Sequence, residues 1–159
     1  MAEWEEAGFV FGWMGPDPTA KTHSNAPYGF STTSDVFEPN RAVPSFTLRA
    51  RTRLHPKVLQ TLPAPTTAFG VELGSNTKTT DEDLKEIARF KQVTVLSVAW
   101  APITDAGLKE VAKMQNLQWL GLAVTQITDT GLKDVAKLKK LKSLNLQATQ
   151  ITDAGLKEV

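Results

Sequence analysis

The chain has 159 residues, of which 41% are hydrophobic and 22% are charged, and its formal net charge is +1. This length predicts one domain, and the small net charge gives no general electrostatic reason to expect nucleic-acid binding. Cysteine is absent, which excludes disulfides and thiolate metal sites, and no apolar run reaches the roughly 20 residues of a membrane-spanning helix.

Residues 1–42 are predicted to form an irregular N-terminal segment. The first 14 residues mix large apolar side chains, such as Trp4, Phe9 and Trp13, with three glutamates. We interpret them as a short element that packs against the rest of the chain, with a partner-docking segment as the alternative. Their acidic character differs from that of a secretory signal, so we expect a cytoplasmic protein. Residues 15–44 are rich in Pro, Gly, Ser, Thr and Asn, which favours loops.

Residues 43–79 are predicted to form a degenerate repeat that caps a repeat array. Apolar and polar residues alternate at its start, in VPSFTL, which indicates a strand. Pro56 suits the first turn of a short helix and Pro63 ends it. A second strand is expected around Val71. Terminal repeats of solenoids are atypical because one side meets solvent.

Residues 80–159 repeat one motif every 24 residues, anchored at Thr80, Thr104, Thr128 and Thr152. The four copies read TDEDLKEIARF, TDAGLKEVAKM, TDTGLKDVAKL and TDAGLKEV, and the last copy is incomplete. A fixed period of about 20–29 residues is typical of a solenoid, whose stacked copies bury a continuous core.

Each copy combines a strand with a short helix. Leu120 and Leu122 alternate with small residues, which is strand spacing, while Leu132 and Val135 recur at helical spacing. Strands are accordingly expected at residues 95–98, 119–122 and 143–146. The aspartate before each helix is expected to be its N-cap, because its carboxylate can accept hydrogen bonds from the first turn. These aspartates are Asp81, Asp105, Asp129 and Asp153.

The pattern LxxLxLxxTxITDxGLxxVAxL resembles the leucine-rich repeat. It is most similar to the TDAGL-type repeats of bacterial proteins, notably those of planctomycetes, and is related to the cysteine-containing repeats of eukaryotic F-box proteins. The resemblance implies a right-handed α/β solenoid with a parallel sheet on its concave side and helices on its convex side. It also implies a non-enzymatic scaffold that binds a protein or peptide.

Two positions depart from the family pattern. Where the family usually carries Asn or Cys, this chain has Ala101, Thr125 and Thr149. A threonine hydroxyl can hydrogen-bond the loop backbone, whereas Ala101 cannot. Asp83 stands where the later copies have glycine, which marks the first repeat as atypical.

A partner-binding face is predicted on the concave side of the sheet. In this repeat type the residues between the inward leucines face solvent, and an exposed Trp beside small residues is typical of a binding hot spot. Trp119 is therefore the expected principal contact. The alternative is that residues 1–14 fold over this surface and bury it. The predicted partner-binding residues are Trp119, Trp100, Val95, Ser97, Gly121, Ser143, Asn145 and Gln147.

No catalytic, metal or cofactor site is predicted. His23 and His55 are each isolated, whereas a metal site needs several ligands, and no phosphate-binding glycine loop, GxSxG or HExxH motif occurs. One basic cluster is interpreted as a solvated face, because cations near helix ends are favourable in any case, with an anionic partner as the alternative. Its lysines are Lys133, Lys137, Lys139, Lys140 and Lys142.

Other roles stay open beside protein binding. The sequence stops part-way through a helix at Val159, so the chain can be an N-terminal fragment of a longer repeat protein with a structural role. An F-box-like adaptor in ubiquitin ligation is less favoured, as is an enzyme whose chemistry lies in the first 44 residues. An incomplete last repeat exposes an apolar end and a strand edge, which predicts self-association through that end.

Overall fold

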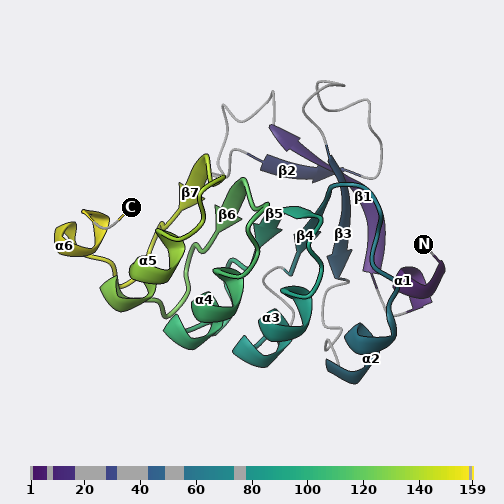
Figure 1. The fold of residues 1–159 in the computed structure, drawn as a ribbon, viewed down its shortest axis with the longest axis horizontal. Coiled ribbons are helices and arrows are strands. Elements are labelled where there is room, and N and C mark those ends of the chain that lie inside the picture. Colours follow the sequence, from purple (N-terminus) through teal and green to yellow (C-terminus); the bar gives the residue numbers. More distant parts are fainter. Residues whose placement is uncertain are drawn as a thin grey trace.

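The computed structural model describes residues 2–6, 9–16, 28–31, 43–48, 56–73, 78–157 and 159. Within these residues the strands form one seven-stranded sheet in the order β2-β1-β3-β4-β5-β6-β7, with helices arranged along it (Figure 1). The strands are β1 (Phe9–Pro16), β2 (Tyr28–Ser31), β3 (Val43–Leu48), β4 (Phe69–Glu72), β5 (Val93–Ser97), β6 (Trp119–Gly121) and β7 (Ser143–Asn145). The helices are α1 (Ala2–Glu6), α2 (Pro56–Thr61), α3 (Asp81–Ile87), α4 (Asp105–Val111), α5 (Asp129–Val135) and α6 (Asp153–Leu156).

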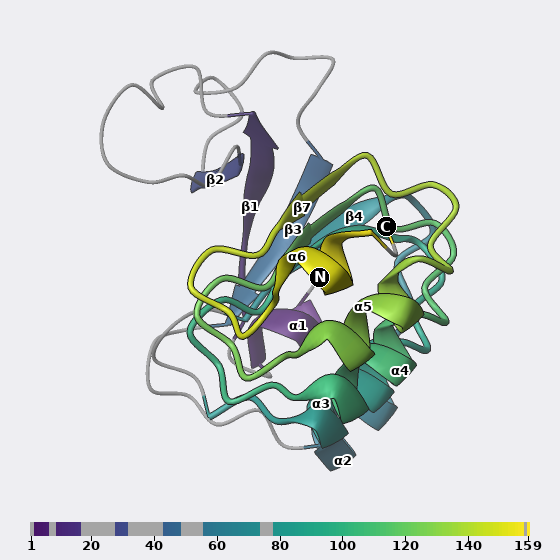
Figure 2. The same cartoon turned by 90° about the vertical axis from the view of Figure 1, so that its left-hand side faces the viewer.

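Strands β3 to β7 pair in parallel, as the repeat predicts. Leu96 lies beside Leu120, and Leu120 lies beside Leu144, so residues one period apart are neighbours across the sheet. Figure 2 shows helices α2 to α5 stacked in one layer beside the sheet. The predicted α/β solenoid with a parallel sheet and a separate helix layer is therefore confirmed.

The core lies between the sheet and the helix layer. Leu96 and Leu120 of the strands are fully buried, and so are Leu108 and Leu132 of the helices. One repeat cannot bury its apolar side alone, so each depends on neighbours above and below it. Leu144 in the last repeat is only half-buried, because it has a neighbouring repeat on one side.

The N-terminal part of the chain extends the sheet. Strand β1 pairs antiparallel with β2 on one side and with β3 on the other. Phe9, at the start of β1, is fully buried and belongs to the main core, as the packing interpretation of the first residues requires. The prediction of an irregular segment is wrong for β1 and β2, because the backbone edge of β3 pairs with β1 and no local sequence pattern reveals that pairing. Residues 17–27 and 32–42 lie outside the described part.

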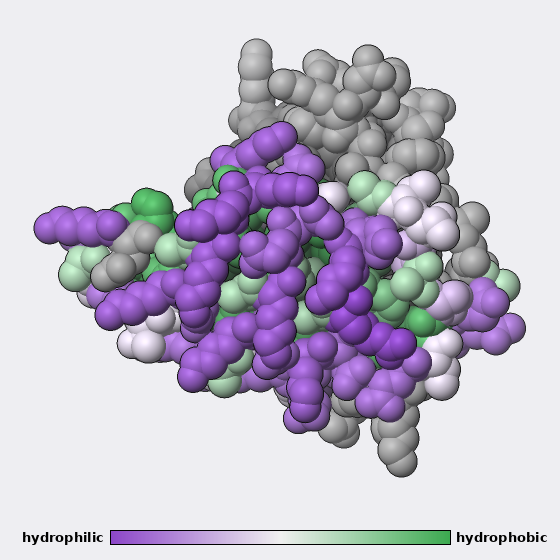
Figure 3. All heavy atoms as spheres, in the orientation of Figure 1, coloured by the Kyte–Doolittle hydropathy of each residue, from purple (hydrophilic) through white to green (hydrophobic). Residues whose placement is uncertain are grey.

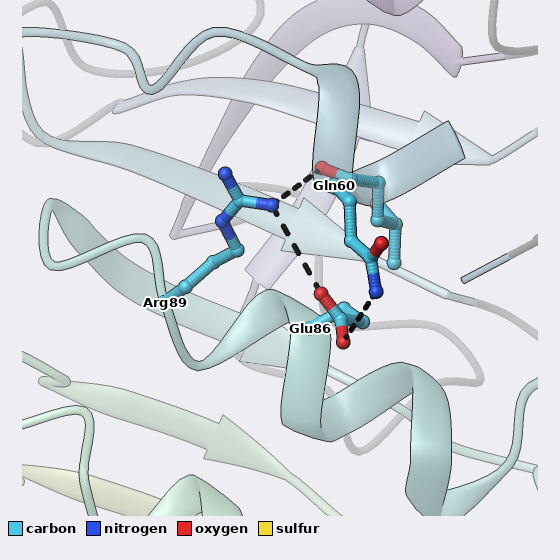
Figure 4. A network of polar contacts seen from close by, with 4 residues as sticks. Gln60, Glu86 and Arg89 are labelled. Atoms are coloured by element: carbon cyan, nitrogen blue, oxygen red, sulfur yellow. Dashed lines mark hydrogen bonds and ion pairs between the residues drawn. The ribbon is translucent and has the colours of Figure 1, made fainter. Parts of the chain in front are cut away.

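The strand, short helix and strand expected over residues 43–79 are present as β3, α2 and β4. Helix α2 packs at the start of the helix layer and contacts α3 through a small polar network (Figure 4). Gln60 Nε2 donates to Glu86 Oε1 at 3.2 Å, and Arg89 donates to the carbonyl oxygen of Leu59 at 3.2 Å. These contacts join α2 to the first regular repeat.

The Thr-Asp pair before each regular helix ties neighbouring repeats together. Threonine is the N-cap, since Thr128 Oγ1 accepts a hydrogen bond from the backbone N–H of Thr130 at 3.3 Å. The aspartate instead bonds the following repeat: Asp105 accepts from the Thr128 backbone N–H at 2.8 Å and from its hydroxyl at 2.7 Å. The same two bonds join the equivalent pairs, Asp81 with Thr104 and Asp129 with Thr152. The predicted capping role of the aspartates is therefore wrong, because threonine is the N-cap of all four helices and the carboxylates of Asp81, Asp105 and Asp129 are bonded to the next repeat.

Glycine inside the helix leaves room for that carboxylate. A Cβ added at Gly131 would overlap Asp105 Oδ1 and would lie 2.8 Å from Leu108 Cδ1. In the first repeat Asp83 takes the place of the glycine, and its Oδ2 accepts from the backbone N–H of Thr80 at 2.8 Å and from its hydroxyl at 3.1 Å. The first repeat thus provides from within itself the acceptor that each later repeat receives from its neighbour.

Candidate functional site

The candidate site is the sheet face turned away from the helices, here called the concave face. Two rows of residues cross β5, β6 and β7 on this face. The first row is Val95, Trp119 and Ser143, and the second row is Ser97, Gly121 and Asn145. None of these side chains carries a formal charge, so the face can contact apolar and neutral polar groups without burying an ion.

The two ends of the concave face differ in exposure. Val95 is 4% exposed and Ser97 is 9% exposed, so little of β5 is accessible. Ser143 and Asn145 of β7 are half-buried, and Gln147 beyond β7 is exposed. Apart from Trp100, which follows β5, the accessible residues of the predicted set therefore lie toward the last repeat.

Trp119 occupies the middle of the concave face but is only 3% exposed. Its indole ring lies against Gly121, where an added Cβ would overlap the ring carbon Cη2. Glycine at this position gives the ring space to lie along the strand, since no side chain occupies it. The expected exposure of Trp119 is therefore wrong, while a role for it in binding stays a prediction.

Trp100 follows β5 and is 64% exposed. Its φ is 65°, in the left-handed region that non-glycine residues rarely adopt, and Val124 and Ala148 adopt the same conformation with φ of 55° and 53°. The backbone N–H groups of Trp100 and Val124 donate to the carbonyl oxygens of Ala123 and Gln147, both at 2.9 Å. We call the row of Trp100, Val124 and Ala148 the C-terminal rim, because it lies at the C-terminal ends of the strands.

The C-terminal rim was only partly visible in the sequence. Trp100 belongs to the predicted partner-binding residues, whereas Val124 and Ala148, each one 24-residue period further along the chain, do not. That spacing was the available signal, and the left-handed backbone conformation that the three share appears only in the structure.

The turns beyond the strands are held by threonine, as predicted. Thr125 Oγ1 donates to the carbonyl oxygen of Leu122 at 2.7 Å, and Thr149 Oγ1 donates to that of Leu146 at 2.7 Å. Ala101, which is buried at the equivalent position, has no hydroxyl to make this bond. The turn that carries Trp100 therefore lacks one side-chain anchor that the two following turns possess.

The helix layer presents a different surface. Glu110 pairs with Lys113 at 2.6 Å, and Asp134 pairs with Lys137 at 2.5 Å, both along the exposed side of their helices. Figure 3 shows hydrophilic residues over this layer and hydrophobic surface near the end where α6 lies. Exposed ion pairs of this kind contribute little to stability, and they are what the solvated-face interpretation of these lysines expects.

Chemical sites of other kinds are not evident in the described part of the chain. No group of three or more His, Cys, Asp or Glu side chains gathers there in a way that could hold a metal ion. No helix among those residues has the length and apolar character needed to cross a membrane. His23 and His55 lie outside the described residues.

Part of the chain is similar to known proteins. The family described as "Leucine Rich repeat" matches residues 93–112 and 137–159. No curated protein matches the sequence. Among solved structures, the chain is similar to an internalin (inlF) from Listeria monocytogenes, with 22% identity over 56% of this chain and a TM-score of 0.40. The match covers 32% of the internalin chain, so this chain spans only part of that protein's length. The family match identifies leucine-rich repeats at residues 93–112 and 137–159, and the parallel strands β3 to β7 with their helix layer form an α/β solenoid.

Proposed function

We propose that this chain is a non-enzymatic leucine-rich-repeat scaffold that binds a protein or peptide through its concave face and C-terminal rim. The observation that carries the proposal is the 64% exposure of Trp100, which stands in one row with Val124 and Ala148. Exposed apolar patches mark interaction sites, and tryptophan is enriched among the residues that dominate binding energy.

The concave face supports the rim in two ways. Its accessible residues near the last repeat offer neutral hydrogen-bonding groups to a partner, and its buried residues hold the sheet rigid beneath them. The accessible set is Ser143, Asn145 and Gln147, and the buried set is Val95, Ser97, Trp119 and Gly121. A rigid sheet with an apolar anchor at one edge suits a partner that lies across several strands.

The test compares Trp100→Ala with Lys133→Ala, a variant on the helix layer, in affinity capture from the native cell followed by mass spectrometry. A partner that the first variant loses and the second retains is then purified for titration. We expect Trp100→Ala to weaken its binding by about 2 kcal/mol, or about thirtyfold in Kd, with an unchanged melting midpoint. Equal binding by both variants, or a melting midpoint that falls together with affinity, contradicts the proposal.

A second candidate function is self-association through the last repeat. Leu156 is 50% exposed and Val159 is 55% exposed, and β7 stands at the edge of the sheet. Unpaired strand edges and exposed apolar groups associate with other chains. Sedimentation of the 1–159 chain should show dimers or larger species that Leu156→Glu reduces, and a stable monomer at high concentration counts against this candidate.

Other expectations from the sequence stay predictions. They are a cytoplasmic location, a bacterial origin, a purely structural role at the start of a longer solenoid, and an F-box-like adaptor role in ubiquitin ligation. Binding of a partner through Trp100 favours the scaffold over the purely structural role, because a structural repeat needs no exposed aromatic anchor.

A further inference from the structure

A polar hollow lies at the N-terminal ends of β5 and β6. Its volume is about 240 Å³, and it is lined by Ala68, Gln92, Thr94, Asn116, Gln118 and Lys140. It is separate from the C-terminal rim, because Trp100 follows the opposite end of β5. A site in this hollow would therefore act independently of the proposed protein-binding face.

The repeat builds this hollow from two columns of residues. Gln92, Asn116 and Lys140 follow one another at the 24-residue period, and Thr94 and Gln118 form a second column with the same spacing. Because parallel strands stack in register, each column runs straight across the repeats. The hollow is thus a groove between two polar columns.

Lys140 is held in place at one end of this groove. Its Nζ donates to Asn116 Oδ1 at 2.7 Å, and Asn116 Nδ2 in turn donates to the carbonyl oxygen of Lys91 at 2.9 Å. Asn116 therefore links three successive repeats and directs the ammonium group. An ammonium carries three donors, so the bond to Asn116 leaves two for a ligand.

Lys140 gives the groove a positive charge. It is the charged residue among the described residues that line the groove, and none of these is a carboxylate. Two carboxylates of the helix layer are paired with other lysines, Glu110 with Lys113 and Asp134 with Lys137. The side-chain amides of Gln92 and Gln118, both half-buried, have no hydrogen-bond partner among the described residues. Two amides and one directed ammonium are therefore available to a ligand.

We propose that this groove binds the C-terminal end of a peptide chain. The terminal carboxylate pairs with Lys140 Nζ, because a charge-assisted hydrogen bond is stronger than a neutral one. Gln92 and Gln118 have both donors and an acceptor, so they can bond a carboxylate oxygen and the N–H of the last peptide group. A hollow of about 240 Å³ has room for one or two terminal residues.

The test is an NMR titration of the full 1–159 chain with N-acetyl-Gly-Gly, following the side-chain amide signals of Gln92 and Gln118. Three further probes test which group of the ligand is recognised. N-acetyl-Gly-Gly amide lacks the negative charge, N-acetylglutamate α-amide carries its carboxylate on a side chain, and inorganic phosphate is a different anion. Lys140→Gln removes the ammonium and Lys140→Arg keeps a positive charge. Lys139→Gln is the matched control, since Lys139 is exposed, adjacent and outside the lining.

We expect saturable shifts with N-acetyl-Gly-Gly that weaken about tenfold in Lys140→Gln, in keeping with the loss of one hydrogen bond to a charged group. The Kd of Lys140→Arg and of Lys139→Gln for N-acetyl-Gly-Gly should stay within about twofold of that of the natural chain. Absence of saturation overturns the proposal, and so does equal weakening by Lys139→Gln. Equal binding of the amide, the glutamate derivative or phosphate overturns the assignment to a peptide C-terminus.

Discussion

Gly131→Ala is the change that most directly tests how the repeats are joined. In an open helix this substitution stabilises by about 1 kcal/mol, because alanine restricts the unfolded chain more than glycine. Here the new methyl group would overlap Asp105 Oδ1 and press on Leu108 Cδ1. The carboxylate must then leave Thr128, to which it is bonded at 2.8 and 2.7 Å. We expect a net loss of about 1–3 kcal/mol in the free energy of unfolding.

Asp105→Ala supplies the second arm of a double-mutant cycle. It removes both hydrogen bonds to Thr128 and leaves a part-buried N–H without its acceptor, at a cost of about 2–4 kcal/mol. When Asp105 is alanine, no carboxylate overlaps the methyl group added at position 131, and only the flexible end of the Leu108 side chain has to move. The double variant Asp105→Ala/Gly131→Ala should therefore be more stable than the sum of the single changes by about 1 kcal/mol or more.

Urea denaturation of the natural chain and the three variants measures the coupling. Thr130→Ala is the matched control, because this exposed residue lies in the same helical turn and its loss should cost no more than about 0.5 kcal/mol. Additive losses in the double variant, or stabilisation by Gly131→Ala alone, would refute the explanation that glycine is required by the neighbouring carboxylate.

Three further outcomes are expected. Leu120→Ala should lower the free energy of unfolding by about 2–5 kcal/mol in urea melts, against less than about 0.5 kcal/mol for Lys133→Ala, and equal losses would mean that the inward face is misassigned. Trp119→Ala should cost about 3–5 kcal/mol in the same assay, because the ring is 3% exposed, and an unchanged midpoint would contradict its packing role. Hydrogen bonds from the hydroxyl and the backbone N–H of Thr152 lower the pKa of Asp129 from its ordinary 3.8, so its stabilising contribution is present above pH 3.8 and is lost as pH falls through the lower folded value. NMR titration of the carboxyl carbon should show this lowered pKa rising in Thr152→Val, and an unchanged midpoint would rule out the hydroxyl as its principal cause.

The repeat array was predictable because its signals are local. The alternation around Leu120 and the helical spacing of Leu132 and Val135 depend on residues only a few positions apart. A constant 24-residue period then places equivalent residues side by side, since parallel strands pair in register. The parallel sheet, the helix layer and the inward leucines follow from these facts alone.

The candidate site was predicted less well, because exposure depends on neighbours. Trp119 was placed on the correct face, but its burial required the ring to lie against Gly121 within the folded sheet. Trp100 belongs to the predicted partner-binding residues, and that role stays a prediction, while Val124 and Ala148 join it in one row only through their shared left-handed backbone. The local sequence pattern therefore predicts which residues lie on the concave face, but it does not predict which of them are accessible to a partner.

The sequence by itself determined the period, the element types and the inward face of this protein. Tertiary structure decided the role of the Thr-Asp pair, because the donors to Asp105 come from Thr128, 23 residues further along the chain. It also decided the place of β1, whose partner β3 is distant in sequence. The sequence shows that Thr and Asp recur every 24 residues but not which group each carboxylate bonds, so only the folded arrangement shows that Asp81, Asp105 and Asp129 join one repeat to the next.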